Sequence, residues 1–179
     1  MRTAVPGSVA PIPSTAGAGG APLLARIDGP PPPVPPDVMT RDTMGAVTVR
    51  AIKLGRGLRL DGKFDEPGYD QVLPVTGLVQ QVPNEGAPAS EKTEVWIMFD
   101  ETDLFVGARL WDSAPSSEWV VNEMRRDAFQ TFWNENFRIC LDTLYDLRSG
   151  VGFYTNPLGA LSDQQFVNEG APNQDWNPI

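Results

Sequence analysis

The chain has 179 residues, of which 41% are hydrophobic and 21% charged, enough for one ordinary domain plus a tail. Its net charge of −9 and isoelectric point near 4.4 argue against binding to nucleic acid or to an anionic membrane surface. No apolar run approaches the ~20 residues of a membrane helix, and the first residues lack the apolar core of a secretory signal. The acidic balance is typical of a solvated surface.

Residues 1–46 differ in composition from the rest of the chain. They hold ten of the eighteen prolines, many small residues and almost no aromatic side chains. Such a segment cannot bury enough apolar surface to offset the entropy of ordering it, so we predict a disordered or extended arm. The proline run at 30–36 favours polyproline II and a stiff spacer, with a proline-rich peptide ligand as the functional alternative.

The chain has no histidine and a single cysteine, Cys140. An intrachain disulfide is therefore excluded, and a nucleophilic thiol would lack its usual histidine base. The same two facts argue against a zinc site. Cys140 lies in an alternating run, which favours an ordinary strand thiol.

The first half of the folded region contains alternating segments separated by turn residues. We predict strands at 47–54 and 77–81, a short helix that opens at Asp65-Glu66-Pro67 and ends before Pro74, and a loop at 82–91. A hairpin is predicted at 93–112, with two alternating strands around the acidic turn 100–103.

The second half shows fewer clear patterns. Residues 118–129 are compatible with either a short helix or irregular structure. A second hairpin is predicted from strands at 136–143 and 151–155, across the turn at 144–150. After Asn156 the sequence becomes polar and predicts loop structure up to Ile179.

Many short strands with little helix predict an all-β fold, specifically an antiparallel β-sandwich of jelly-roll or immunoglobulin-like type, or a barrel. Five or six strands would leave several sheet edges unpaired. We therefore expect the sandwich, assigned to 47–179, to be truncated at its C-terminal end, with further strands after Ile179.

Several motifs occur in an order that resembles carbohydrate-binding module family 9. These are LDGKFDEP at 60–67, TEVWIMFDETDLFVGARLWD at 93–112 and NFRICLDT at 136–143. Segments 80–95, 122–129, 155–161 and 175–177 resemble bacterial proteins that carry this module before an outer-membrane-β-barrel-like region. The resemblance implies a jelly-roll sandwich, a polysaccharide or oligosaccharide ligand, and a place in the cell envelope or outside the cell.

The resemblance also implies candidate carbohydrate-binding residues. Trp133 matches a tryptophan that forms one side of the family's sugar slot, and Asn156 matches a family asparagine. Arg138 stands where the family has a sugar-contacting acid, and Tyr154 stands near a family arginine. The second tryptophan of the slot has no counterpart, because Trp176 occurs too early in the order.

The remaining chemistry-bearing residues have structural interpretations beside the functional ones. Trp96 and Trp111 are expected to cover the second face of the hairpin, and Trp119 is expected to be a packing residue. Asp142, Asp146, Asp163 and Asp175 offer oxygen ligands for a structural calcium ion, although acid-rich turns without a metal are favoured. No other cofactor is predicted.

No phosphate loop, nucleophile elbow or distinct carboxylate pair is present, so we predict no enzyme activity. Family members are linked with glycoside hydrolysis and carbohydrate catabolism through their partner domains. The sequence thus predicts a non-catalytic carbohydrate-binding module. The alternative is a structural or interaction domain that docks on a following barrel or partner protein.

Overall fold

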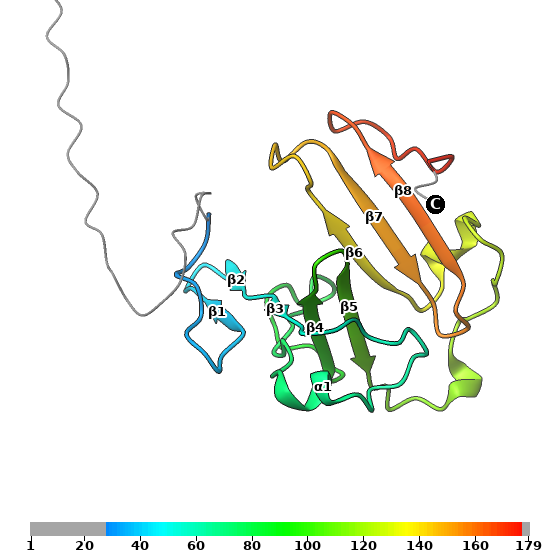
Figure 1. Cartoon of the computed structure of the whole chain (residues 1–179). Coiled ribbons are helices and arrows are strands. Elements are labelled where there is room, and N and C mark those ends of the chain that lie inside the picture. The colour runs from blue at the N-terminus through cyan, green and yellow to red at the C-terminus, as the bar shows by residue number, and fades with distance from the viewer. Residues whose placement is uncertain (1–27, 177–179) are drawn as a thin grey trace, which may run out of the picture.

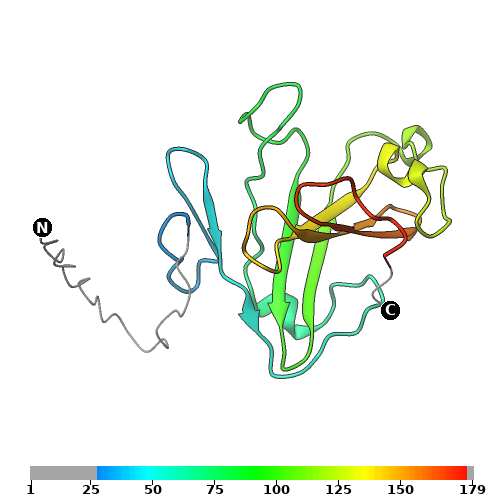
Figure 2. The same cartoon turned by 90° about the horizontal axis from the view of Figure 1, so that it is seen from above.

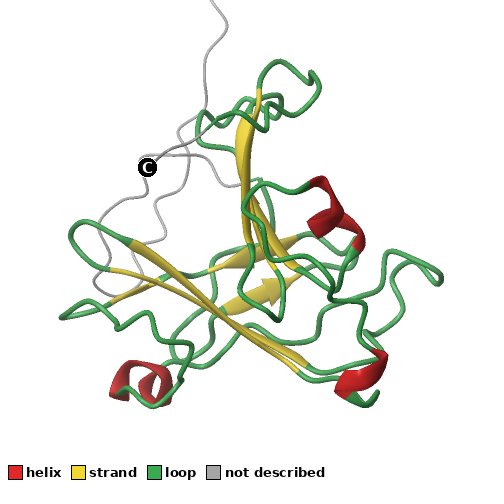
Figure 3. Cartoon of the chain, turned by 90° about the vertical axis from the view of Figure 1, so that its right-hand side faces the viewer, coloured by secondary structure: helices red, strands yellow, loops and turns green. Residues whose placement is uncertain are grey.

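The computed structural model describes residues 28–176 and confirms the all-β class (Figure 1). Figure 3 shows these residues as strands and loops with only short helical pieces. The strands form three sheets, with orders β1-β2, β3-β4-β5 and β6-β7-β8. They are β1 (Met39–Arg41), β2 (Val47–Val49), β3 (Ile52–Lys53), β4 (Thr93–Phe99), β5 (Leu104–Leu110), β6 (Phe137–Leu141), β7 (Gly150–Thr155) and β8 (Leu161–Phe166).

The helical pieces are α1 (Pro67–Gln71) and the 3-10 turns η1 (Ser116–Glu118) and η2 (Phe129–Trp133). Helix α1 starts at the predicted proline, but no side chain caps it. The Glu66 carboxylate instead accepts the backbone N–H of Arg59 at 3.0 Å. Within residues 28–176 no helix has the length and apolar character that crossing a bilayer requires.

The small β1-β2 hairpin stands beside the proline-rich segment. Thr48 donates its hydroxyl to the carbonyl of Pro30 at 2.6 Å, and Arg50 donates to the carbonyl of Asp37 at 2.9 Å. Proline lacks an N–H but keeps its carbonyl, so the segment can accept these bonds. Only residues 28–46 of the predicted arm are described, and they contain β1. The division of the chain at residue 46 stays a prediction.

The predicted hairpin at 93–112 is confirmed as β4 and β5, paired antiparallel from Thr93↔Leu110 to Phe99↔Leu104. Its turn is built by Asp100, whose carboxylate accepts the backbone N–H groups of Thr102 and Asp103, both at 2.9 Å. An aspartate at the first position of a turn satisfies backbone donors that no strand can reach.

Two predictions in the first half of the chain are wrong. Residues 47–54 form two strands in different sheets, and β3 pairs parallel to β4, with Ile52 opposite Met98. The predicted strand at 77–81 forms only an isolated bridge between Val79 and Pro88. Pro83 and Pro88 in the returning segment have no backbone donor, so a regular ladder cannot continue there.

The apolar core of the first sheet lies on the face of β4 that carries Trp96 and Met98, which are 5% and 0% exposed. The rings of Phe64 and Tyr69 pack on Trp96 at centroid distances of 5.1 and 5.7 Å. Trp96 also donates its indole N–H to the carbonyl of Val72 at 3.0 Å. The prediction that Trp96 is a packing residue is therefore confirmed.

The second predicted hairpin is confirmed as β6 and β7, but the loop predicted after Asn156 is wrong. Residues 161–166 form β8, which pairs antiparallel with β7 from Thr155↔Leu161 to Gly150↔Phe166. The strand LSDQQF is mostly polar, so its formation follows from pairing with β7 and not from an apolar stripe. Ser162, Asp163 and Gln164 are all buried.

The segment before η2, which the sequence left ambiguous, is mostly irregular and closes the outer edge of β8. Asp127 donates its backbone N–H to the carbonyl of Leu161, and its carboxylate accepts the N–H of Asp163. Further along, Asn173 exchanges two backbone hydrogen bonds with Gln165. Figure 2 shows the strands of this sheet running across β4 and β5.

Candidate functional site

A groove of about 820 Å³ lies between residues of β5 and the segments that flank β6 and β7. Its lining combines aromatic rings with charged and amide side chains, the composition that small-molecule sites usually show. The residues that matter most for ligand chemistry are Phe64, Arg109, Trp111, Trp119, Glu135 and Asn136. Glu91, Asp112 and Asn156 also border the groove.

Trp111 and Trp119 are partly open to solvent, at 38% and 36% exposure. Trp111 directly follows β5, and Trp119 follows η1, where its indole N–H donates to the carbonyl of Ala114 at 3.3 Å. Turn η1 thus brings Trp119 back to the groove beside the end of the hairpin. The sequence predicted packing roles for both residues, but the structure places both on the groove wall.

The cations beside the groove are already paired. Arg109 lies over the rings of Phe64 and Trp111 at 4.8 and 5.8 Å, and Lys92 lies over Trp111 at 4.3 Å. Both cations also contact the carboxylate of Glu94, at 2.7 Å from Lys92 and 3.8 Å from Arg109. These contacts fix the ring of Trp111 and leave part of its surface open.

Trp133, the strongest candidate from the resemblance, is 73% exposed at the end of η2. Its ring meets Phe129 edge-on at 6.2 Å. It does not line the groove, although its neighbours Glu135 and Asn136 do. The structure therefore presents Trp133 on an open surface outside the groove that holds Trp111 and Trp119.

Arg138 and Tyr154 are opposite each other on β6 and β7, and the guanidinium lies 5.5 Å from the phenol ring. Tyr154 is buried, packs edge-on against Phe132 at 4.7 Å and is hydrogen-bonded to the amide of Gln164. Burial, followed by the nearby Cys140, raises the pKa of the Tyr154 phenol. This ring is a core component of the second sheet.

Asn156 borders the groove, but its side chain is used in hydrogen bonds to the backbone of neighbouring segments. Its amide donates to the carbonyl of Glu123 at 2.7 Å and accepts the backbone N–H groups of Leu158 and Ala160 at 3.1 and 3.0 Å. Asn156 is 6% exposed. The structure thus brings Arg138 next to Tyr154, while Trp133 and Asn156 occupy separate environments.

Ion pairs also stabilise the segment around Glu123, whose carbonyl accepts the hydrogen bond from Asn156. Glu123 is buried and accepts hydrogen bonds from the guanidinium and backbone N–H of Arg125, which hold its pKa down to about 2. Arg126 pairs with the buried Asp163 at 2.5 Å. Burial nevertheless raises the pKa of Asp163 above its usual range, and Arg126 opposes that shift.

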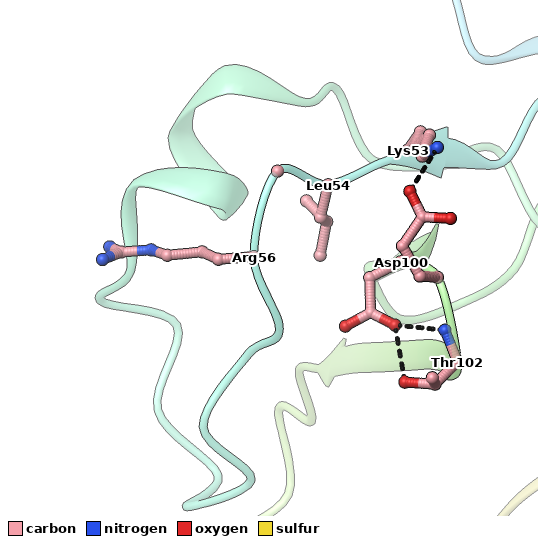
Figure 4. Close-up of a pocket in the computed structure, with 7 residues that line it drawn as sticks. Lys53, Leu54, Arg56, Asp100 and Thr102 are labelled. Carbon is pink, nitrogen blue, oxygen red and sulfur yellow. Dashed lines mark hydrogen bonds and ion pairs between the residues drawn. The ribbon is translucent and has the colours of Figure 1, made fainter.

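A second hollow, of about 480 Å³, lies where β3 ends beside the acidic turn (Figure 4). Lys53 pairs with Glu101 at 2.7 Å, and Arg56 points away from the other labelled side chains in Figure 4. The Asp100 carboxylate is used in the turn, and the backbone N–H groups of Thr102 and Asp103 lower its pKa. Lys53, Glu101 and Asp100 are therefore committed to local structure, and Arg56 is the charged lining residue that these contacts do not include.

Three of the four acids considered for calcium have local roles in the structure. Asp142 accepts the backbone N–H of Leu147 at 2.7 Å, and Asp146 accepts that of Ser149 at 2.7 Å. Asp163 is paired with Arg126. Within the described part of the chain, no three acidic, cysteine or histidine side chains gather as a metal-binding group.

Comparisons of the chain with protein-family models, curated proteins and solved structures found no match.

Proposed function

We propose that this chain is a non-catalytic carbohydrate-binding module and that the groove beside Trp111 and Trp119 holds the sugar. The carrying observation is that two partly exposed tryptophans line one groove together with amide and charged side chains. Indole rings stack on the apolar faces of pyranose rings, while polar groups bond the hydroxyls. The motif order that resembles family 9 supports the same ligand class.

The proposal includes the finer fold and setting. The sheets β3-β4-β5 and β6-β7-β8 are proposed as parts of a jelly-roll sandwich, which is the architecture that the resemblance implies. The module would present a polysaccharide or oligosaccharide to a larger cell-envelope or secreted protein, such as one with a β-barrel region. Any glycoside hydrolysis would belong to the partner domain.

A second candidate function is a structural or interaction domain. It is favoured by the exposed pair Phe129 and Trp133, since two large apolar side chains in contact at a surface are typical of protein docking. In this case the groove would have lost sugar binding. The two functions differ in the tryptophan that contacts the ligand: Trp119 for a sugar in the groove, and Trp133 for a partner protein.

Calorimetry with soluble xylan-, cellulose- and chitin-derived hexasaccharides tests the proposal. Trp119→Ala should weaken binding by about tenfold or more, equivalent to about 1.4 kcal/mol, because it removes one wall of the groove. Trp133→Ala is the matched tryptophan control and should leave binding unchanged. Circular dichroism checks that both variants fold.

Three outcomes separate the hypotheses. A loss confined to Trp119→Ala supports the groove. A loss confined to Trp133→Ala would move the site to the residue that the resemblance indicates. Absence of binding to every glycan by the whole chain would refute sugar binding and leave the interaction domain.

A further inference from the structure

The charges at the groove are unbalanced. Glu91, Asp112 and Glu135 border it, and Glu94 lies just behind through its contacts with Lys92 and Arg109. Four carboxylates therefore face two cations, and both cations share the same glutamate. The surplus is negative, as for the whole chain, whose net charge is −9. A groove whose lining has more charges of one sign than of the other, as here with three acids and Arg109, concentrates ligands of the opposite sign.

The surplus carboxylates keep free acceptor capacity. Glu135 is exposed, and among residues 28–176 its carboxylate forms no hydrogen bond or ion pair. Asp112 uses one oxygen to accept the N–H of Ala114 at 2.7 Å, and Glu91 uses one to accept the hydroxyl of Ser113 at 2.5 Å. Each acid thus has at least one oxygen that can accept a bond from a ligand.

The aromatic wall is suited to the same kind of ligand. The ammonium of Lys92 already lies 4.3 Å from the centre of the Trp111 ring, which shows that this indole accepts a cation at its face. A ligand that carries both pyranose rings and ammonium groups would use the indoles and the carboxylates together. A polyuronate would instead bring its negative charge next to Glu91, Asp112 and Glu135.

We propose that the groove selects glycans rich in protonated amino sugars, such as oligomers of glucosamine, over neutral glycans and over polyuronates. This specificity rests on the proposed sugar-binding function. The site itself is defined by the groove and its two tryptophans, and the carboxylates determine which sugars it prefers. Glu135 contributes most directly, because no group among residues 28–176 competes for its carboxylate.

The test compares three ligands of equal length by calorimetry at about pH 5.5, where ordinary glutamates are ionised and the sugar amines are protonated. Glucosamine hexamer should bind more tightly than N-acetylglucosamine hexamer, which has the same ring but no positive charge. A glucuronate-containing hexamer should bind most weakly. The preference for the glucosamine hexamer should shrink as salt is raised, because salt screens exposed charges.

Two matched variants locate the effect. Glu135→Gln should weaken glucosamine-hexamer binding about threefold, as expected for one exposed charge pair, and leave the N-acetylated hexamer unchanged. Glu85 is an exposed glutamate that does not line the groove. Glu85→Gln changes the net charge by the same amount and should leave the binding of both hexamers unchanged.

Equal binding of the acetylated and free-amine hexamers would overturn the amino-sugar inference while the sugar-binding function stands. An equal loss in Glu135→Gln and Glu85→Gln would overturn it as well, because bulk charge would then explain the preference. Binding of none of these three hexamers would also overturn the amino-sugar inference, and the proposed function itself would be refuted only if the xylan- and cellulose-derived hexasaccharides failed to bind as well.

Discussion

The two three-stranded sheets are stabilised in different ways. Behind β4, the core is made of large apolar and aromatic side chains, centred on Trp96 and Met98. Around β7 and β8 the buried residues are mainly polar, and they include Thr131, Asn134, Asn156, Ser162, Asp163 and Gln164. Apolar burial tolerates small shifts in geometry, whereas a buried polar group is costly unless its partner is in place. Because Asn134 and Asn156 have their partners in place, the second sheet depends on individual hydrogen bonds to a degree that the first does not.

The largest effect is expected from the apolar core. Met98→Ala should lower the free energy of unfolding by about 2–5 kcal/mol, because it removes a fully buried side chain and leaves a cavity. Met98→Leu keeps the volume and should cost less than about 1.5 kcal/mol. Urea unfolding measures both values. A similar small cost for both variants would mean that this sheet does not rely on packing.

The next effect comes from the polar region. Asn156→Ala removes three hydrogen bonds and leaves the buried carbonyl of Glu123 without its donor, so a cost of about 1–3 kcal/mol is expected. Asn84→Ala, in an exposed loop, should stay within about 0.5 kcal/mol in the same urea experiment. Equal costs for the two would contradict the role assigned to Asn156.

A smaller effect should appear as a dependence on pH. The pKa of Glu123 is about 2 in the folded protein against an ordinary 4.5, so its ionised form favours the folded state. The stabilisation is fully present above about 4.5 and is lost as the pH falls towards 2. It is limited because Arg125 is largely exposed and solvent screens the pair.

Unfolding measured between these pH values should become less pH-dependent in Glu123→Gln. Glu85→Gln is the control and should keep the dependence of the unmodified chain. An unchanged slope in Glu123→Gln would show that the pair with Arg125 contributes nothing measurable.

The smallest change in stability is expected when the buried hydroxyl of Ser162 is removed. The Oγ atom of Ser162 is buried and has no hydrogen-bond partner within the described residues. Ser162→Ala removes that unpaired group, so stability should stay within about 0.5 kcal/mol or rise by up to about 1 kcal/mol. Urea unfolding measures the change. A loss above about 1 kcal/mol would show that an ordered water satisfies the hydroxyl.

The contrast between an apolar first sheet and a second sheet with buried polar residues also explains which strands the sequence predicts. The β4-β5 hairpin follows from alternating side chains and an acidic turn, and the β6-β7 hairpin follows from the same kind of pattern. Strand β8 was missed because its buried residues are serine, aspartate and glutamine, which a hydrophobic pattern assigns to a loop. Burial of polar residues depends on tertiary partners that local sequence does not contain.

The groove was also beyond sequence reasoning. Phe64, Trp111 and Asn136 come from distant segments and meet only after the two sheets are placed. Sequence reasoning assigns Trp111 and Trp119 to packing and, through the family resemblance, places the sugar site at Trp133 instead. A partial signal is the sequence on one side of each residue, since Asp112 and Ser113 follow Trp111, and Ser117 and Glu118 precede Trp119.

Within residues 28–176 the two edges of the second sheet differ, because the outer side of β8 is covered and the outer side of β6 is not. Asp127 and Asn173 occupy the backbone groups of β8 on its outer side, while in the described residues no strand pairs with β6 on the side away from β7. Among the described residues, β6 is therefore the open edge of this sheet. Edge-to-edge pairing of the second sheet would begin at β6, which makes β6 a strand to guard, together with the edge strand β5 of the first sheet, when the protein is engineered for solubility.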